Sequence, residues 1–276
     1  MRVLPSEPPT FKDLHIEEEI IKSWSPRNGM VIVTGPTGSG KTTTLYACVQ
    51  QIDRRRRHVL TIEDPIEYAI DGIEQIQVNQ NSGLTFANGL RSILRQDPNT
   101  IMVGEIRDRE AMETCMEAAQ TGHLVLSTLH TNSAAETITR LMNMGVPAFN
   151  IASSVSLIIA QRLGRRLCKQ CSVPETDIPH DALIELGFTE AMLETATIKR
   201  AVGCNACKDG YRGRVGIYEV VKVTKTLANL IMDGDSSLDL DKQARLEGFA
   251  DLRLSALRKA AQGLISLEEV NRVTTD

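Results

Sequence analysis

The chain has 276 residues, of which 42% are hydrophobic, and it carries a formal net charge of −4 at pH 7. This length and apolar content can bury a sizeable core, so we expect one large globular domain or one domain with a small appendage. The mildly acidic balance argues against constitutive nucleic-acid or anionic-membrane binding, and no apolar run is long enough to span a bilayer.

The first residues predict the end of a preceding domain. Residues 2–4 form a short extended piece that leads into a Pro-rich linker, and a helix is expected over residues 15–24. Because an isolated strand has nothing to pair with, we expect residues 1–14 to be the end of a missing N-terminal domain plus a linker. The polar start also lacks the apolar core of a signal peptide, so we expect a cytoplasmic chain whose six cysteines are reduced.

Strands and helices then alternate along the chain. Apolar strands are expected at 29–34, 58–62, 100–103 and 123–129, and helices at 41–52, 86–95 and 111–120, with a polar hairpin-like stretch before the second helix. This alternation predicts an α/β fold with a parallel sheet and helices on both faces.

The pattern changes in the second half of the chain. Residues 132–163 read as helical, a cysteine-bearing insert with a helix-like middle at 181–193 follows, and a strand at 215–223 precedes mostly helical residues 227–273. We expect an α/β core over 15–167, a cysteine module over 168–211 and a mostly helical portion over 212–276.

A glycine-rich loop follows the first core strand and opens a helix. The segment GPTGSGKT satisfies G-x-x-x-x-G-K-[ST] in the strand-to-helix context that makes this motif specific. Its backbone N–H groups and the helix N-terminus form a cradle for a polyphosphate, Lys41 reaches the β and γ phosphates, and the Thr42 hydroxyl suits Mg²⁺. The predicted nucleotide-binding residues are Gly35, Pro36, Thr37, Gly38, Ser39, Gly40, Lys41, Thr42 and Thr43.

Carboxylates follow two of the neighbouring strands. Glu63 and Asp64 come after the second core strand and Glu105 after the third, where ligands bind at the carboxyl edge of a parallel sheet. We predict that Glu63 is the general base that positions the attacking water, and that Glu105 holds Mg²⁺ through water or assists that base. The alternative is a solvated carboxylate at a strand end or, for Asp64 or Asp108, a helix cap.

A histidine stands at each end of the strand in TGHLVLSTLHTN. His130, at the carboxyl end, is placed to sense the γ-phosphate. His123 lies at the opposite end, roughly 20 Å away, so both cannot touch one phosphate within a subunit. His123 is either a contributor from another subunit or a residue that caps the strand or packs at an interface.

Four cysteines form two Cys-x2-Cys pairs. Four thiolates at this spacing suit tetrahedral, structural Zn²⁺, with unmetallated or redox-active thiols as the alternative. The predicted zinc ligands are Cys168, Cys171, Cys204 and Cys207. Cys48 and Cys115 fall within predicted helices and are expected to be buried thiols.

Two arginine clusters stand out. One is the run 54–57, just after a helix, and the other comprises Arg162, Arg165 and Arg166. Each cluster either lies in solvent at the end of a helix, where positive charge interacts favourably with the helix dipole, or makes a contact across a subunit boundary. The absence of neighbouring aromatic residues argues against single-stranded nucleic acid.

The order of these motifs resembles the ATPases of type II secretion and type IV pilus assembly. The matching segments are GPTGSGKTTTLYA, TIEDPIEY, LRSILRQDPNTIMVGEIRD, TGHLVLSTLHTN and AQRLGRRLC, followed by GC-x2-C and GYRGRVGIYEV. In that family they correspond to the Walker A loop, aspartate box, Walker B segment, histidine box and tetracysteine zinc module. The resemblance implies the C-terminal ATPase portion of such a protein: a RecA-like P-loop NTPase core, a small tetracysteine zinc module and a helical C-terminal portion.

The resemblance also implies partners. Family members are cytoplasmic homohexamers docked on an inner-membrane platform protein, so they are peripheral to the membrane through partners, and ATP hydrolysis moves pilin-like subunits. Their N-terminal domain supplies arginines to a nucleotide site, and only residues 1–9 look like its end here. Typical pilus-retraction and DNA-transfer relatives lack the tetracysteine module, which favours the assembly or export branch.

We therefore predict Mg²⁺-dependent ATP hydrolysis with ATP, Mg²⁺ and Zn²⁺ as ligands, and Arg107 as a candidate for communication between subunits. Two alternatives remain open on the sequence alone. One is a nucleotide-gated assembly scaffold with negligible turnover, and the other is a pilus-retraction or DNA-transfer motor of the same superfamily.

Overall fold

The computed structural model describes residues 8–16 and 27–275, so the predicted strand at 2–4 and most of the predicted helix at 15–24 lie outside the described residues. The chain forms two compact units. The core unit comprises the described residues of Met1–Ala160 and Val220–Phe249, and the cysteine unit those of Gln161–Glu219 and Ala250–Asp276. Residues 212–276 thus contribute to both units, whereas the sequence predicts a linear succession of parts.

A mainly parallel sheet organises the core unit. Its strand order is β3-β2-β4-β5-β1-β6-β9, and every pair from β3 through to β6 is parallel. The strands are β1 Gly29–Thr34, β2 Val59–Glu63, β3 Glu74–Gln77, β4 Thr100–Val103, β5 Leu124–Leu129, β6 Val155–Leu167 and β9 Tyr211–Lys222. The predicted parallel α/β sheet is confirmed.

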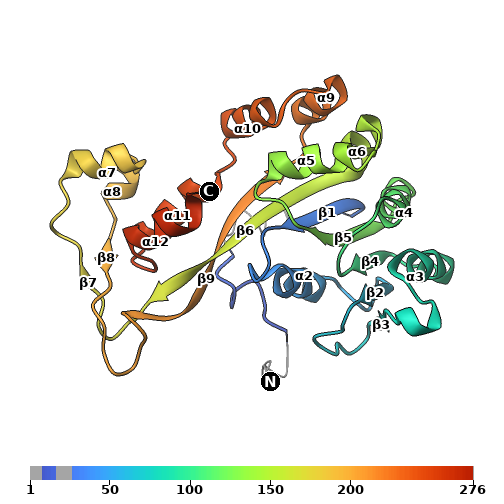
Figure 1. Ribbon diagram of the computed structural model, residues 1–276, viewed down its shortest axis with the longest axis horizontal. Coiled ribbons are helices and arrows are strands. Elements are labelled where there is room, and N and C mark those ends of the chain that lie inside the picture. The colour runs from blue at the N-terminus through green and yellow to red at the C-terminus, as the bar shows by residue number, and fades with distance from the viewer. Residues whose placement is uncertain (1–7, 17–26, 276) are drawn as a thin grey trace. The chain divides into compact units, whose positions relative to one another are not determined.

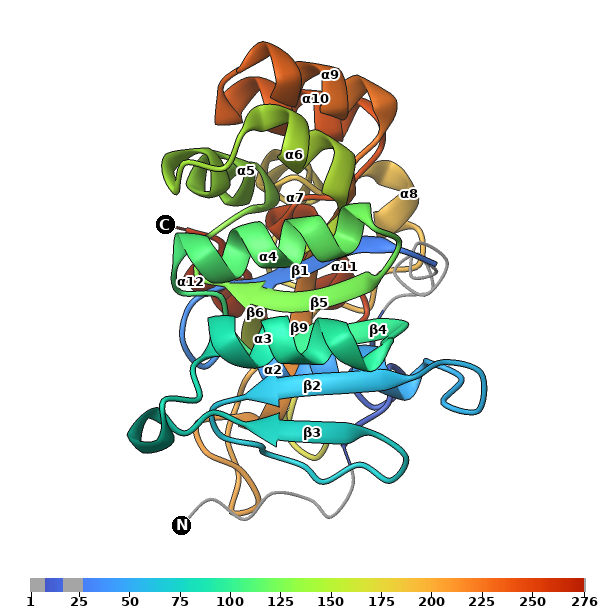
Figure 2. The same cartoon turned by 90° about the vertical axis from the view of Figure 1, so that its right-hand side faces the viewer.

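Helices cover both faces of this sheet. Helix α2 (Lys41–Gln50) lies on one face, and α3 (Phe86–Ile93) and α4 (Arg109–Gln120) lie on the other (Figures 1 and 2). Strands covered on both sides lose the polar alternation of a half-exposed strand, which is why β1, β4 and β5 are apolar and buried nearly throughout. The carboxyl ends of these strands therefore open onto one edge, where the phosphate loop begins.

The helical prediction over residues 132–163 is wrong for its last part, residues 155–163. Helices α5 (Ala134–Asn143) and α6 (Ala148–Ser154) end at Ser154, and the next 13 residues form strand β6. β6 pairs in parallel with β1, and the β-branched and apolar run around Ile158 and Ile159 is buried in that position. A buried apolar run of this kind can form either a helix or a strand. Here it forms a strand because it pairs with β1. The hairpin-like stretch after β2 likewise contains β3, which is parallel to β2.

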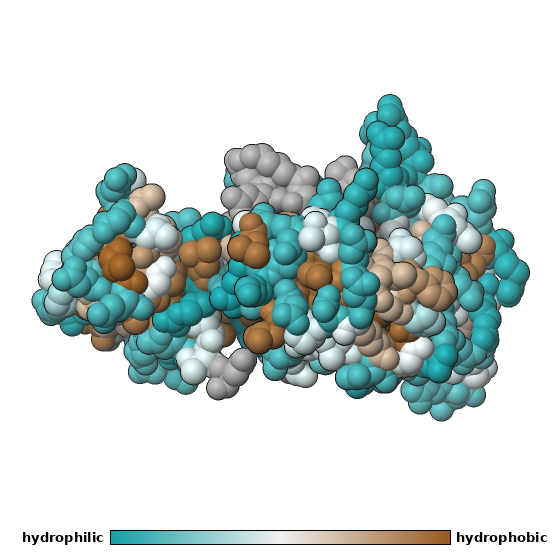
Figure 3. Space-filling view, turned by 90° about the horizontal axis from the view of Figure 1, so that it is seen from above, coloured by the Kyte–Doolittle hydropathy of each residue, from teal (hydrophilic) through white to brown (hydrophobic). Residues whose placement is uncertain are grey.

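Two further helices complete the core unit. Helices α9 (Lys225–Asp233) and α10 (Ser237–Leu246) pack against α6 and α5 respectively. On the face that α9 and α10 form, apolar side chains lie among hydrophilic ones (Figure 3), and Leu238 and Leu246 are the most exposed of them, at 76% and 74%. Across the described residues, no helix is long and apolar enough to cross a lipid bilayer.

The cysteine unit has a small apolar core of its own. It holds a two-stranded ribbon, short helices and two helices of the C-terminal segment, and Ile217, Leu257, Ala260 and Ile265 are buried among them. The predicted helix at 181–193 is broken at Gly187, which adopts φ 108°. Its elements are β7 Val173–Pro174, α7 His180–Leu186, α8 Glu190–Leu193, β8 Lys199–Arg200, α11 Leu252–Ala261 and α12 Leu267–Thr274.

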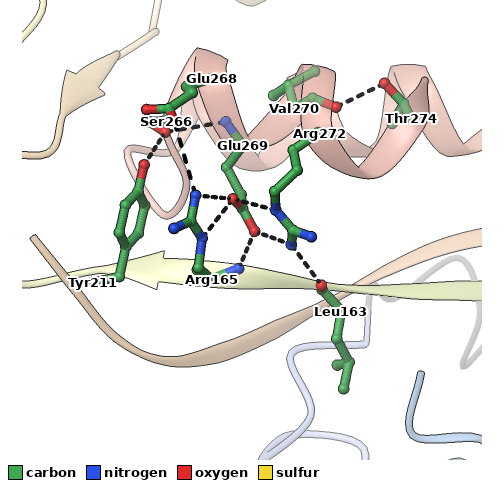
Figure 4. Close-up of polar contacts among 9 residues, drawn as sticks. All are labelled: Leu163, Arg165, Tyr211, Ser266, Glu268, Glu269, Val270, Arg272 and Thr274. Atoms are coloured by element: carbon green, nitrogen blue, oxygen red, sulfur yellow. Dashed lines mark hydrogen bonds and ion pairs between the residues drawn. The ribbon is translucent and has the colours of Figure 1, made fainter. Parts of the chain in front are cut away.

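A buried carboxylate ties α12 to the end of β6 within this unit. Figure 4 shows Arg165 and Arg272 both turned toward Glu269, whose side chain is 0% exposed. Glu269 accepts hydrogen bonds from the Arg165 backbone N–H (2.6 Å) and Nε (2.8 Å) and from Arg272 Nε (2.8 Å). Burial alone would raise the pKa of Glu269, but these hydrogen bonds outweigh it, and the pKa lies below its ordinary value. The guanidinium of Arg165 also stacks on the Tyr211 ring at 4.1 Å.

We expect Glu269→Gln to destabilise the chain by about 1–3 kcal/mol at pH 7, because a neutral amide cannot accept all the hydrogen bonds that Arg165 and Arg272 donate to this buried carboxylate. A carboxyl with a lowered folded pKa stabilises fully above its ordinary pKa of 4.5 and loses that contribution as the pH falls through the lowered value. Thermal unfolding should therefore separate wild type and Glu269→Gln widely at pH 7 and narrowly near pH 3. Glu268→Gln, whose side chain is 79% exposed, is the matched control, and an equal effect of both variants would contradict this assignment.

Candidate functional site

The phosphate loop is shaped by glycines between β1 and α2. Gly38 and Gly40 adopt φ of 79° and 88°, which side chains with a Cβ rarely adopt, and α2 begins at Lys41. Lys41 Nζ donates to the carbonyls of Gly35 (2.8 Å) and Pro36 (3.1 Å), and the residue is 8% exposed. Because those carbonyls hold the ammonium in the concavity of the loop, its charge is already placed where a polyphosphate would lie.

Lys41, at the start of α2, begins a line of polar groups whose other members follow strands β5 and β4. Its Nζ lies 3.4 Å from His130 Nδ1, and His130 Nε2 lies 3.4 Å from a Glu105 oxygen. Lys41 can only donate, so Nδ1 accepts and Nε2 carries the proton that faces Glu105. The other Glu105 oxygen accepts from Arg107 at 2.9 Å. The structure thus brings together Lys41, His130, Glu105 and Arg107.

Glu105 is an ionised carboxylate open to the loop. Its side chain is 28% exposed. The hydrogen bond from Arg107 lowers the pKa of Glu105, and the charges of Arg107 and Lys41 act in the same direction. A carboxylate in this position can orient a water molecule or support a hydrated Mg²⁺ next to a nucleotide.

Glu63 lies in a different environment. It is 2% exposed, and its carboxylate accepts from the Tyr46 hydroxyl, the Thr61 hydroxyl (2.5 Å) and the Gln75 amide (3.1 Å). The Tyr46 oxygen also accepts the backbone N–H groups of Glu67 (3.1 Å) and Tyr68 (3.2 Å). Burial, together with the Glu63 hydrogen bond, raises the pKa of Tyr46. Glu63 is therefore enclosed in this arrangement, and Glu105 is the more accessible carboxylate.

The structure separates His123 from this group. His123 Nδ1 lies 2.9 Å from the Ala118 carbonyl, at the end of α4 and before β5 begins. This contact is with the last turn of helix α4, whereas the predicted alternative is a cap on the strand or packing at an interface. Asp108 caps α4, since its side chain accepts the Ala111 N–H at 2.8 Å.

The four cysteines of the two Cys-x2-Cys pairs lie together in the cysteine unit, with their sulfur atoms within 4.8 Å of one another. Individual Sγ distances are 3.9 Å for Cys168–Cys204, 3.7 Å for Cys171–Cys207 and 3.6 Å for Cys204–Cys207. A tetrahedral site with Zn–S bonds of about 2.3 Å separates its sulfurs by about 3.8 Å, so this donor set fits zinc. A backbone hydrogen bond from Gln170 lowers the pKa of Cys168 to about 7, whereas burial raises the pKa of Cys171.

The remaining sequence features have local roles in the structure. Cys48 and Cys115 are buried, as predicted. Arg54 donates to the Asp71 carbonyl at 2.8 Å and Arg57 to the Arg27 carbonyl at 2.9 Å, so the first arginine cluster contacts its own surroundings.

Sequence reasoning missed the groups that hold the site residues in place. Tyr46 and Gln75 enclose Glu63, and hydroxyls of Thr34 and Thr131 join the phosphate-loop strand to the residue after His130. The only signal available was their position beside motifs, since a Tyr or Thr within an apolar helix or strand reads as an ordinary packing residue.

Comparisons with known proteins identify the family of the chain. A family model for type II/IV secretion system proteins matches residues 12–272. The type IV pilus assembly ATPase PilB of Pseudomonas aeruginosa is 56% identical over 248 residues, which cover 90% of this chain and 44% of that protein. The type II secretion system protein E of the same organism is 50% identical over 251 residues, covering 90% and 49%. This chain thus spans about half the length of these curated relatives.

A solved structure shares the fold over the whole chain. The crystal structure of the pilus retraction motor PilT with bound ADP gives a TM-score of 0.76 at 31% identity and covers 100% of this chain and 69% of that one. The predicted α/β P-loop ATPase fold and the family resemblance are both confirmed. By its sequence, its fold and the arrangement of its phosphate loop, the chain belongs to the type II/IV secretion system protein family.

Proposed function

We propose that this chain hydrolyses ATP as the motor portion of a machine for type IV pilus assembly or type II protein secretion. The observation that carries the proposal is the meeting of Lys41, His130 and Glu105 beside the phosphate loop, from the carboxyl ends of adjacent parallel strands. Relatives named as pilus assembly ATPases and secretion proteins support the choice of machine.

The site residues act by position and charge. Lys41 exchanges its two loop carbonyls for the β and γ phosphates of ATP, which neutralises charge as the terminal bond breaks. His130 faces the same ammonium and reports the γ-phosphate, and Glu105 orients the attacking water. Glu63, the predicted general base, accepts from Tyr46, which in turn accepts two backbone N–H groups of the loop after β2. Glu63 could contact the attacking water only if its hydrogen bonds with Tyr46, Thr61 and Gln75 opened.

Two metals belong to this proposal. The Thr42 hydroxyl and, through water, Glu105 would hold Mg²⁺, which supplies charge neutralisation between phosphate groups. The four clustered thiols would hold a structural Zn²⁺ that folds the cysteine unit. Arg107 donates to Glu105 and interacts electrostatically with Asp64. A neighbouring subunit that displaced Arg107 would remove the hydrogen bond that lowers the pKa of Glu105.

The proposed assembly is a homohexamer at the cytoplasmic face of the inner membrane, docked on a platform protein and without constitutive nucleic acid. The chain covers about half of its curated relatives, so the partner contacts and any arginines supplied in trans are assigned here to the complete protein. Absence of DNA-stimulated turnover would separate this motor from a DNA-translocating one.

We expect Lys41→Ala to weaken Mg²⁺-ATP binding and to lower phosphate release by at least about 100-fold, because the Lys41 ammonium is the positive charge that the loop carbonyls hold in the concavity. Lys225→Ala, at an exposed position at the start of α9, is the control and should behave as wild type. Calorimetric titration with ATP and a phosphate-release assay provide the measurement. Tight ATP binding with negligible wild-type turnover would instead support a nucleotide-gated scaffold.

A further inference from the structure

A chain of three threonine hydroxyls runs from the phosphate-loop strand to helix α5. Thr34 Oγ1 lies 2.6 Å from Thr131 Oγ1, which lies 2.6 Å from Thr137 Oγ1. Thr34 ends β1 immediately before the phosphate loop, Thr131 directly follows His130, and Thr137 lies in the first turn of α5. Thr34 and Thr137 are 0% exposed, so these contacts are shielded from competing water.

The hydrogen bonds between the three threonine hydroxyls can all run in one direction. Thr137 donates to the Ser133 carbonyl at 2.9 Å and therefore accepts from Thr131. Thr131 then accepts from Thr34 at 2.6 Å, a shorter contact than those of the Thr34 hydroxyl with the Thr131 (3.1 Å) and Leu129 (3.2 Å) carbonyls. Thr34 itself accepts the Thr131 backbone N–H at 2.9 Å. Each hydroxyl donates once, and the central hydroxyl of Thr131 is used as both donor and acceptor. Replacing Thr131 alone therefore breaks both side-chain links.

The two ends of the chain lie at functional positions. At one end, the Thr131 backbone and side chain are bound to Thr34, which fixes the adjacent His130 at 3.4 Å from Lys41. At the other end, Ser133 and Glu136 cap the first turn of α5, and α5 packs against α10 in the same unit. The Thr131 side chain therefore links the segment next to His130 with the first turn of α5.

We propose that Thr131 is a positioning residue that holds His130 against the phosphate loop and couples nucleotide state to helix α5. This inference rests on the proposed function, since it assigns a support to the γ-phosphate sensor. A methyl-for-hydroxyl exchange at Thr131 removes both side-chain links with little change in volume and leaves the backbone hydrogen bond to Thr34 in place.

The test compares Thr131→Val, which keeps the shape, with Thr131→Ser, which keeps the hydroxyl. Binding of ADP and of a non-hydrolysable ATP analogue, both with Mg²⁺, gives an affinity ratio that reports γ-phosphate sensing without turnover. Thr131→Val should lower the preference for the ATP analogue about tenfold while ADP affinity stays within about threefold, and Thr131→Ser should restore it. Thr139→Val, whose hydroxyl bonds only within α5 at 3.4 Å, is the matched control.

A double-mutant cycle tests whether Thr131 acts through His130. In a His130→Ala background, Thr131→Val should change the ratio by less than about twofold, whereas independent effects would multiply. Hydrogen exchange should show nucleotide-dependent protection of residues 133–138 in wild type and not in Thr131→Val.

The outcomes separate this inference from the proposed function. If wild type binds Mg²⁺-ATP and Thr131→Val keeps the wild-type ratio, or if its effect multiplies with that of His130→Ala, the positioning role is overturned. If wild type binds no nucleotide, the proposed function itself fails.

Discussion

Replacing Glu105 with glutamine is expected to lower kcat for ATP hydrolysis by at least about 100-fold while Mg²⁺-ATP affinity changes by less than about threefold. The reason is that Glu105 is the accessible carboxylate beside Lys41 and His130, and the uncharged amide orients water poorly. Its side chain is 28% exposed, so the exchange should leave the thermal unfolding temperature nearly unchanged. Steady-state phosphate release and thermal unfolding of the same preparation measure both quantities.

Glu63→Gln should behave differently, because Glu63 is enclosed by donors. Gln75 cannot turn, since its Nε2 also donates to the Tyr68 carbonyl (2.9 Å) and its Oε1 accepts the Ile70 N–H (2.8 Å). A glutamine at position 63 must point its NH₂ at either Gln75 or the Tyr46 hydroxyl, so one buried donor loses its acceptor at a cost of about 1–3 kcal/mol. A fall of several degrees in Tm should therefore accompany any loss of activity.

Glu67→Gln, at an exposed position in the loop that follows Glu63, controls for the chemical change itself. The opposite pattern would return the general base to Glu63: turnover lost at constant Tm in Glu63→Gln and retained in Glu105→Gln. That result would also mean that the Tyr46–Glu63 hydrogen bond opens when nucleotide binds.

Removal of zinc should also have a large effect, on the folding of the cysteine unit. We expect about one zinc per chain, and we expect its chelation, or Cys204→Ser, to unfold the cysteine unit, because structural zinc contributes on the order of 10 kcal/mol to the folding of small modules. Limited proteolysis should then cut between Cys171 and Cys204, where the ribbon and short helices α7 and α8 lie. Metal analysis of the purified chain, followed by proteolysis with and without chelator, provides the measurement.

Cys48→Ala is the matched control, since Cys48 is a buried thiol in α2 of the core unit, outside the cluster. It should keep the full zinc content. A chain that carries no zinc and resists proteolysis equally with and without chelator would contradict the structural role, and the thiols would then have to be explained by redox chemistry.

Local sequence was sufficient for much of the nucleotide site. The phosphate loop was predictable because glycine spacing, a preceding apolar strand and a following helix all act over short distances, and β1 and β4 begin and end where their apolar runs do. Residues that follow parallel strands meet at one edge, so the proximity of Glu105 and His130 to Lys41 was also predictable. The four cysteines were predictable as a cluster because paired thiols at this spacing suit a single metal ion.

Other features depend on contacts between segments far apart in the chain. Residues 155–167 form a strand because they pair with β1, and their apolar run suits a buried helix equally well. Glu63 is buried rather than open because Tyr46 and Gln75 reach it from other elements, and Glu269 is buried because Arg165 from β6 meets it. By itself, the sequence determined the motifs, the α/β alternation and the family. Only the tertiary structure decided which carboxylate is accessible, since burial and hydrogen-bond partners are set by what packs against a residue and not by its neighbours in sequence.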